Sequence, residues 1–411
     1  MSDYSAFHRQ TEARLLRYAA VTTQSKHYDG SWPTTACQRD LAKLLYDELR
    51  GLGLRAAYDE AHCVVYGWLP AAHVEEDRLI ALVAHVDTAP DVKGWDVKPW
   101  VLRAYPGGDI VLNEAEGIVL RAADYPNLAQ YQGQDLVLTD GTTLLGGDDK
   151  AAIAALMTLA EYYAAHPELP HRSICIAFTP DEEVGGLAQD LDLEKLGAKF
   201  AYTIDGDHLG WYQDQTFNAA EAIVTITGRS VHPATAKGIM VNASDLAAEF
   251  LNALPPKEKP QFTDGVEGFY YVTSLQSDCE HGEIRMIIRD FDRQNFRARQ
   301  DRLLEIARSI NEACGQERVR VEINQQYRNM GDVLEQYPFL VADLEAAIRA
   351  AGLEPKSEPF RGGTDGSALS FRGLPSPNLS AGYENAHGRF EFVPVPSMAK
   401  NVEILIHLTE K

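Results

Sequence analysis

The nine residues LIALVAHVD (79–87) begin as an unbroken apolar run and end with two ionisable side chains, His85 and Asp87. A short apolar run of this kind predicts a buried strand, and RSICIAFTP (172–180) and AYTID (201–205) predict two more. Between the first two runs, AAIAALMTLAEYYAAH (151–166) has the composition and length of a helix. Strands that alternate with helices in this way indicate an α/β domain with a mostly parallel sheet.

Each of these predicted strands is followed by polar, ionisable residues. His85 and Asp87 close the first, Asp181 to Glu183 follow the second, and Asp205 ends the third. In open α/β sheets, ligands bind in the crevice beyond the carboxyl ends of the strands. We therefore expect the three strand ends to converge on one site.

The pattern changes after about Trp211. Successive segments predict a strand, a helix, two strands, a long helix and a strand, namely 221–228, 242–254, 268–275, 283–290, 293–314 and 318–324. The order β-α-β-β-α-β is that of a ferredoxin-like α+β domain. We expect this domain to occupy 213–332 as an insertion, so that 1–212 and 333–411 form the two parts of the first domain.

Composition narrows the class of protein. A chain of 411 residues is long enough for two domains, and its 60 acidic against 38 basic residues, net −22, argue against nucleic acid or an anionic membrane as a partner. The N-terminus mixes charged with apolar residues, unlike a signal peptide, and no run approaches the roughly 20 apolar residues of a membrane span. Five scattered cysteines without a CxxC pair predict reduced thiols rather than a disulfide framework. These features predict a cytoplasmic location.

Four short motifs carry candidate chemistry. In a strand, His85 and Asp87 point to the same side, so His85 can ligate a metal while Asp87 accepts its other ring N–H. The adjacent acids in GGDDK, Asp148 and Asp149, repel one another unless a cation compensates them. The other two motifs, at 181–183 and at the end of AYTID, add further carboxylates. Taken singly, each motif also fits an ordinary histidine, an acidic helix N-cap or a solvated loop.

Within PDEE, one carboxylate can bind a metal while a second takes a proton from water, and a metallopeptidase needs both functions. Asp205 and His387, the latter in AGYENAHGRFEF, extend the set. Histidine and carboxylate ligands without thiolates are typical of a catalytic rather than a structural zinc site.

The strings HVDTAP, GTTLLGGDDKAAIA, FTPDEEVGG, AYTIDGD, FNAAEAIVTITGRSVHPATAKGIMVNA, MIIRDFDR, RGGTDGSALSFRGLPSPNL and HGRFEF cover nearly the whole chain. In this order they resemble the peptidase T family, the tripeptide aminopeptidases among the M20 di-zinc metallopeptidases. The resemblance implies a zinc-peptidase-like catalytic domain with an inserted lid domain. It also implies two Zn²⁺ ions per chain, with Co²⁺ or Mn²⁺ as substitutes, and a short peptide as substrate.

The resemblance also implies roles for individual residues. Asp148 would bridge the two ions, His85 and Asp205 would complete one ion, and Glu183 and His387 the other. Glu182 would be the general base that activates a zinc-bridging water, with Asp87 orienting His85 and Asp149 lying beside the bridge. In the inserted domain, His232 of SVHPATAKG would stabilise the oxyanion.

The substrate-binding residues implied by the resemblance are Arg361, then Arg289, with Asn242 as a weaker candidate. A guanidinium suits a peptide carboxylate, but either arginine also fits a structural ion pair. The chain departs from the family pattern at Asp207 to Trp211 and at Tyr383 to Ala386, so tripeptide preference is open. The alternatives are another M20 activity (dipeptidase, carboxypeptidase or N-acyl-amino-acid deacylase) or a non-catalytic peptide-binding relative. In relatives the inserted domain can mediate dimerisation, and the sequence leaves a homodimer through this domain open here.

Overall fold

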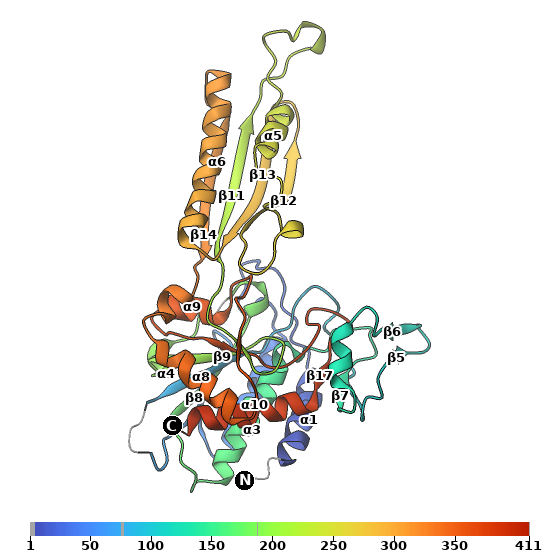
Figure 1. Cartoon of the computed structure of the whole chain (residues 1–411), viewed down its shortest axis with the longest axis vertical. Coiled ribbons are helices and arrows are strands. Elements are labelled where there is room, and N and C mark those ends of the chain that lie inside the picture. Colours follow the sequence, from blue (N-terminus) through green and yellow to red (C-terminus); the bar gives the residue numbers. More distant parts are fainter. Residues whose placement is uncertain (1–4, 75–77, 187, 411) are drawn as a thin grey trace. The chain divides into compact units, whose positions relative to one another are not determined.

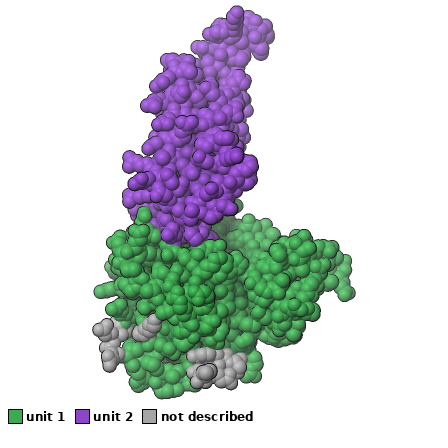
Figure 2. All heavy atoms as spheres, in the orientation of Figure 1, with its two compact units in different colours: residues 1–214, 330–358, 364–411 green, residues 215–329, 359–363 purple. Residues whose placement is uncertain are grey.

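The computed structural model describes residues 5–74, 78–186 and 188–410, and the chain divides into two compact units (Figures 1 and 2). Unit 1 lies within 1–214, 330–358 and 364–411, and unit 2 comprises 215–329 and 359–363. The expected insertion, 213–332, has slightly different ends and lacks the segment Pro359–Gly363. That short segment was not recognisable because its contacts with the rest of unit 2 are distant in sequence.

Unit 1 is built on an eight-stranded sheet. In spatial order its strands are β1 (Arg55–Asp59), β2 (Val64–Leu69), β8 (Ile174–Thr179), β3 (Ile80–His85), β9 (Phe200–Ile204), β16 (Asn378–Leu379), β10 (Trp211–Gln213) and β15 (Lys356–Ser357). The central strands β8, β3, β9 and β16 are parallel, whereas β1, β2 and β8 pair antiparallel, as do β16 and β10. The sheet is therefore mixed, with the expected parallel strands at its centre.

Side chains alternate between the two faces of the central strands, and each face has its own core. Leu82 and Ile176 belong to one hydrophobic cluster, whereas Ala81 and Val83 belong to another. The first cluster takes in α1 (Ser5–Ala19), α2 (Gln38–Gly51), α3 (Gly147–Ala165), α8 (Pro338–Ala350) and α10 (Val395–Thr409), and the second α4 (Leu193–Leu196) and α9 (Asp365–Phe371) (Figure 1). Over the described ranges, no helix combines the length and apolarity that crossing a bilayer requires.

A smaller part of unit 1 was not expected from the sequence. A three-stranded sheet orders β17 (Val393–Pro394), β7 (Leu136–Leu138) and β4 (Trp100–Leu102), beside a hairpin of β5 (Ile110–Asn113) and β6 (Ile118–Leu120). Its core includes Tyr105, Leu128 and Phe392. Because β17 immediately precedes α10, this sheet fixes the C-terminal segment that carries His387.

Unit 2 contains a four-stranded antiparallel sheet in the order β12 (Phe269–Ser277), β13 (His281–Asp290), β11 (Asn218–Thr227) and β14 (Val319–Tyr327). The helices α5 (Ala243–Asn252) and α6 (Arg293–Cys314) pack against it through a core that includes Phe250, Met286 and Leu303 (Figure 1). Chain order and sheet order together are those of a ferredoxin-like fold, as expected.

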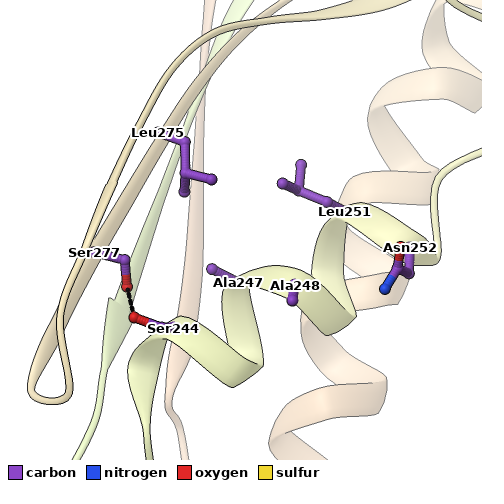
Figure 3. A pocket seen from close by; sticks show the side chains of 7 residues that line it. All are labelled: Ser244, Ala247, Ala248, Leu251, Asn252, Leu275 and Ser277. Atoms are coloured by element: carbon purple, nitrogen blue, oxygen red, sulfur yellow. Dashed lines mark hydrogen bonds between the residues drawn. The ribbon is translucent and has the colours of Figure 1, made fainter.

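A hollow of about 520 Å³ lies between α5 and β12 in unit 2 (Figure 3). A hydrogen bond between Ser244 and Ser277 (3.0 Å) closes one end. None of the side chains that line it is ionisable: Ser244, Ala247, Ala248, Leu251, Asn252, Leu275 and Ser277. This hollow therefore offers no group for acid–base or metal chemistry.

Buried side chains on the central strand β3 should contribute strongly to the stability of unit 1. Truncating fully buried Leu82 (Leu82→Ala) leaves a cavity between the sheet and its helices, and should cost about 2–5 kcal/mol. The matched variant Val111→Ala removes an exposed side chain of the same unit and should change stability by less than about 0.5 kcal/mol. Equilibrium urea unfolding followed by circular dichroism measures both. Equal losses would contradict the assignment of Leu82 to the core.

Candidate metal centre

Three parallel strands deliver ionisable side chains to the same edge of the sheet. His85 is the last residue of β3, Glu182 and Glu183 follow β8 after a tight turn, and Asp205 comes directly after β9. Because β8, β3 and β9 are neighbours and run in the same direction, their carboxyl ends meet. The convergence expected from the sequence is therefore present in the structure.

Asp148 lies at the middle of this cluster. Its Oδ1 is 3.0 Å from Nε2 of His85, and its Oδ2 is 3.3 Å from Nε2 of His387, which is also 2.8 Å from Oε2 of Glu183. The two oxygens of one carboxylate thus face two different histidines, the arrangement of a bridging ligand. Ligand atoms lie within 4.8 Å of one another in three groups: His85, Asp148 and Glu183; His85, Glu182 and Asp205; and Asp148, Asp149 and Asp205.

Burial makes the charge of this cluster costly. Burial raises the pKa of Glu183 to about 8 and that of Asp205 to about 6, and it also raises the pKa of Glu182 and of Asp149. Burial acts in the same direction on Asp148, but its hydrogen bonds with the two histidines outweigh it and lower the pKa of that carboxyl.

The two histidines carry the opposite charge. Hydrogen bonds that its ring donates to Asp148 and then to Glu183 raise the pKa of His387 to about 11. Burial opposes protonation of His85, yet its hydrogen bonds with Asp148 and Asp87 raise its pKa well above the usual value. In the absence of a cation, protons on these histidines and on the carboxyls balance the negative charge.

Asp87 holds two parts of the cluster together. Its Oδ1 lies 3.3 Å from Nδ1 of His85 and accepts the backbone N–H of Glu182 (3.0 Å), while its Oδ2 accepts that of Glu183 (3.2 Å). The backbone carbonyl of Asp87, 3.2 Å from the same Nδ1, and the buried carboxylate together hold the ring of His85, and the carboxylate also fixes the turn that presents the two glutamates. The orienting role expected for Asp87 stays a prediction, with which these contacts are compatible.

The start of α3 and the loop before it depend on a residue that the sequence reasoning missed. Buried Glu391 accepts hydrogen bonds from the backbone N–H groups of Leu145, Gly146 and Asp148, at 2.7–2.9 Å. A Cβ atom at Gly147 would lie 2.5 Å from the side chain of Val393, so only glycine fits there. Its place four residues after His387 was the only signal for Glu391.

Two further residues at the centre were also missed. The hydroxyl of Tyr383 donates to Oδ1 of Asp205 (2.8 Å). Buried Asp365 accepts from Thr179 (2.9 Å), and burial raises its pKa to about 7. Asp365 stands in RGGTDG, the motif that was considered only for its arginine.

The donor set fits divalent cations. Among the described residues, Oδ1 of Asp149, Oε1 of Glu183 and Oδ1 of Asp365 are buried without a hydrogen-bond partner. Buried acceptors of this kind are rare unless an ion or a water satisfies them. Two imidazoles and several carboxylates, with no thiolate, are ligands that zinc and similar ions accept in catalytic sites.

The remaining predicted residues belong to unit 2. His232 is exposed, and its Nδ1 accepts the backbone N–H of Ala234 (3.2 Å), so Nε2 carries the proton. Asn242 is the N-cap of α5 and accepts the N–H of Ser244. Neither residue is part of the metal-ligand groups described above.

The two arginines differ in how many contacts their guanidinium groups already make within unit 2. Arg361 donates to the carbonyls of Thr263, Gly265 and Glu267 and stacks on the rings of Phe217 and Phe269, at 5.1 and 5.5 Å.

Arg289 is buried and donates to the carbonyls of Ala220 and Ile288, beside the ring of Tyr327. No carboxylate lies within 4.0 Å of it in the parts of the chain that the structure describes.

Comparison with known proteins shows the family of the chain. Residues 144–411 match the model of peptidase family M20/M25/M40. The chain is 46% identical to Peptidase T of Geobacillus kaustophilus over 395 residues, which cover 96% of each chain, and 46% identical to that of Desulfitobacterium hafniense over 97% of each.

Solved structures share the fold. Aminopeptidase PepT of Bacillus cereus has a TM-score of 0.77 at 22% identity, and a tripeptidase of Staphylococcus aureus has 0.75 at 21%, each over 98% of both chains. The YXEP protein of Bacillus subtilis, a dinuclear metal-binding M20 peptidase, has 0.65 at 13% over 98% of this chain and 97% of its own. The chain therefore belongs to peptidase family M20/M25/M40 and, within it, to the peptidase T group.

Proposed function

We propose that the chain is a metallo-aminopeptidase that hydrolyses short peptides, most readily tripeptides. The observation that carries the proposal is the meeting of His85, Asp148, Glu183, Asp205 and His387 around one buried centre, with Glu182 beside it. The similarity to Peptidase T relatives supports the substrate class.

We assign two cation positions to this centre. Asp148 would contribute one oxygen to each, with His85 and Asp205 at the first and Glu183 and His387 at the second, and Zn²⁺ is the proposed ion. When bound, such cations supply Lewis acidity, which polarises the peptide carbonyl and lowers the pKa of water. Asp87, Glu391 and Tyr383 would hold the ligands in place through the contacts described above.

Glu182 is the proposed general base. Its pKa is raised by burial and by the neighbouring acids Asp205, Asp365 and Glu183, so its carboxylate has a strong tendency to accept a proton. It would take the proton from the attacking water and return it to the leaving amine as the peptide C–N bond breaks. His232, with its proton on Nε2, is the proposed hydrogen-bond donor to the oxyanion.

The contacts of the two arginines favour Arg289 over Arg361 as the substrate-binding residue. This is the reverse of the order expected from the sequence. The guanidinium of Arg361 is already held by three carbonyls and two rings. Arg289 is buried without an acidic partner among the described residues, and a buried cation gains most from a carboxylate. We infer that it meets the peptide's C-terminal carboxylate.

We also infer a cytoplasmic location. The five cysteines are free thiols, as is usual in a reducing compartment.

Replacing the proposed base should separate catalysis from metal binding. Glu182→Gln keeps the size of the side chain but cannot accept the proton, so kcat should fall roughly 10²–10⁴-fold while cation content stays unchanged. The matched control is Glu168→Gln, an exposed acid of the same unit. Steady-state kinetics together with metal analysis checks this. Unchanged turnover in Glu182→Gln would contradict the assigned base.

Cation binding should release protons. At pH 7 the metal-free centre holds protons on His387 (pKa about 11) and largely on Glu183 (pKa about 8), and a cation must displace them. Affinity for Zn²⁺ should therefore rise steeply with pH up to about 8, where Glu183 loses its proton, and less steeply above it, where only His387 still holds one. Titration calorimetry in buffers of different ionisation enthalpy counts the protons, and Glu183→Gln should release fewer. A binding heat that is independent of the buffer would refute this account.

Peptides matched in length and end group should reveal the substrate class. Acetylation of the α-amine removes the positive charge that an acidic centre attracts, so N-acetylated tripeptides should be hydrolysed roughly 100-fold or more slowly than free ones. Dipeptides and tetrapeptides of the same composition complete the set, with product release followed by chromatography. Preference for blocked peptides would favour a deacylase or carboxypeptidase instead.

A further inference from the structure

Two loops that each carry a proposed ligand are joined along their backbones. The N–H groups of Ala381 and Gly382 donate to the carbonyl of Gly206, at 2.8 and 3.1 Å, and Asp207 forms a parallel bridge with Tyr383. These contacts hold the segment that follows Asp205 against the segment that precedes His387. A change in one loop should therefore be transmitted to the other.

Glu384 is the centre of the side-chain contacts between these loops. Its carboxylate is almost fully buried and accepts hydrogen bonds from the hydroxyl of Tyr131, from Nδ2 of Asn127 (2.7 Å) and from Nδ1 of His208 (3.1 Å). Its backbone N–H and C=O exchange hydrogen bonds with Phe392, at 2.9 and 3.0 Å. That pair closes the loop 385–391, in which His387 lies.

His208 has a defined orientation. Its ring packs edge-on against Trp211 with centroids 4.5 Å apart, and its Nε2 lies 3.7 Å from Oδ2 of Asp207. Trp211 is covered in turn by the amine of Lys356, 3.4 Å from the ring centroid. The imidazole can therefore donate to Glu384 with little loss of side-chain freedom.

The charges of this pair are complementary. The hydrogen bond to Glu384 is the largest cause of a raised pKa at His208. Burial opposes ionisation of Glu384, but its three donors, His208 first, lower the pKa of that carboxyl. Since a buried carboxylate without a partner is strongly unfavourable, removal of His208 should disturb Glu384 and its loop.

We propose that His208 is a positioning residue of the metal centre: through Glu384 it fixes the loop 385–391 and so aims His387 at Glu183 and Asp148. His208 stands in the stretch Asp207 to Trp211, where the sequence departs from the family pattern. The new role rests on the proposed function for its consequence at the metal. It does not make His208 a ligand, because the imidazole faces Glu384 and Asp207.

Two variants separate the hydrogen bond from the backbone. His208 has a left-handed φ of +52°, which glycine and asparagine tolerate. His208→Gly removes the donor without strain, and His208→Asn retains an amide donor near the position of Nδ1. His62→Asn, at an exposed histidine of the same unit, is the control.

Metal affinity is the first measurement. Competition with a chromophoric chelator gives the stepwise affinities for Zn²⁺, and His208→Gly should weaken one of the two steps by about 10- to 100-fold, whereas His208→Asn stays within about threefold of the wild type. In a His387→Ala background, His208→Gly should cause no further loss. Equal damage from His208→Gly and His208→Asn, or none from either, would overturn the proposal.

Hydrogen exchange in the metal-free protein is the second measurement. His208→Gly should speed amide exchange within 384–392 and leave α3 unchanged, while His208→Asn and His62→Asn should match the wild type. If wild-type protein binds no divalent cation, the proposed function fails and the metal role of His208 fails with it. If it binds cations normally but exchange in 384–392 is unaffected by His208→Gly, only the positioning role is overturned.

Discussion

Unit 1 is organised around carboxylates that are largely shielded from water, with only His387 among the five proposed ligands exposed. His85, Asp148, Glu183, Asp205 and His387 meet at the carboxyl edge of the sheet, and Glu182, Asp149 and Asp365 add three more carboxyls. Carboxylates so close together require positive charge or protons. Asp87 and Glu391 accept hydrogen bonds from the backbone that carries these groups, and so hold the groups together in spite of their repulsion.

The same constraint makes the metal-free protein sensitive to pH. The folded pKa values of Glu183 (about 8) and Asp205 (about 6) lie above the usual carboxyl range, so the folded state binds more protons than the unfolded chain near neutrality. Their contribution to stability is complete below the unfolded pKa and is lost as pH rises through the folded values. Bound cations would replace those protons, so folding and metal binding are coupled in this unit.

Much of this arrangement was predictable because local patterns and the parallel sheet agree. The strands that end at His85, Thr179 and Ile204 are recognisable in the sequence as apolar runs. The bounds of α6 are the predicted ones, 293–314. Glu391, Tyr383 and Asp365 were missed because their partners lie far away in sequence and nothing local marks them as buried. The short strands β10, β15 and β16 were missed for the same reason: two or three residues show no periodicity.

Because the segment Pro359–Gly363 belongs to unit 2, that unit is formed from two stretches of the chain that are distant in sequence. Thr216 pairs with Phe360 by a backbone bridge, and Arg361 ties down Thr263 to Glu267 while covering Phe217 and Phe269. A gene fragment for 215–329 alone would leave that aromatic pair open to solvent and the tied loop without its anchor. The inserted unit therefore cannot be moved to another protein as one continuous segment, because five residues that are distant in sequence complete it.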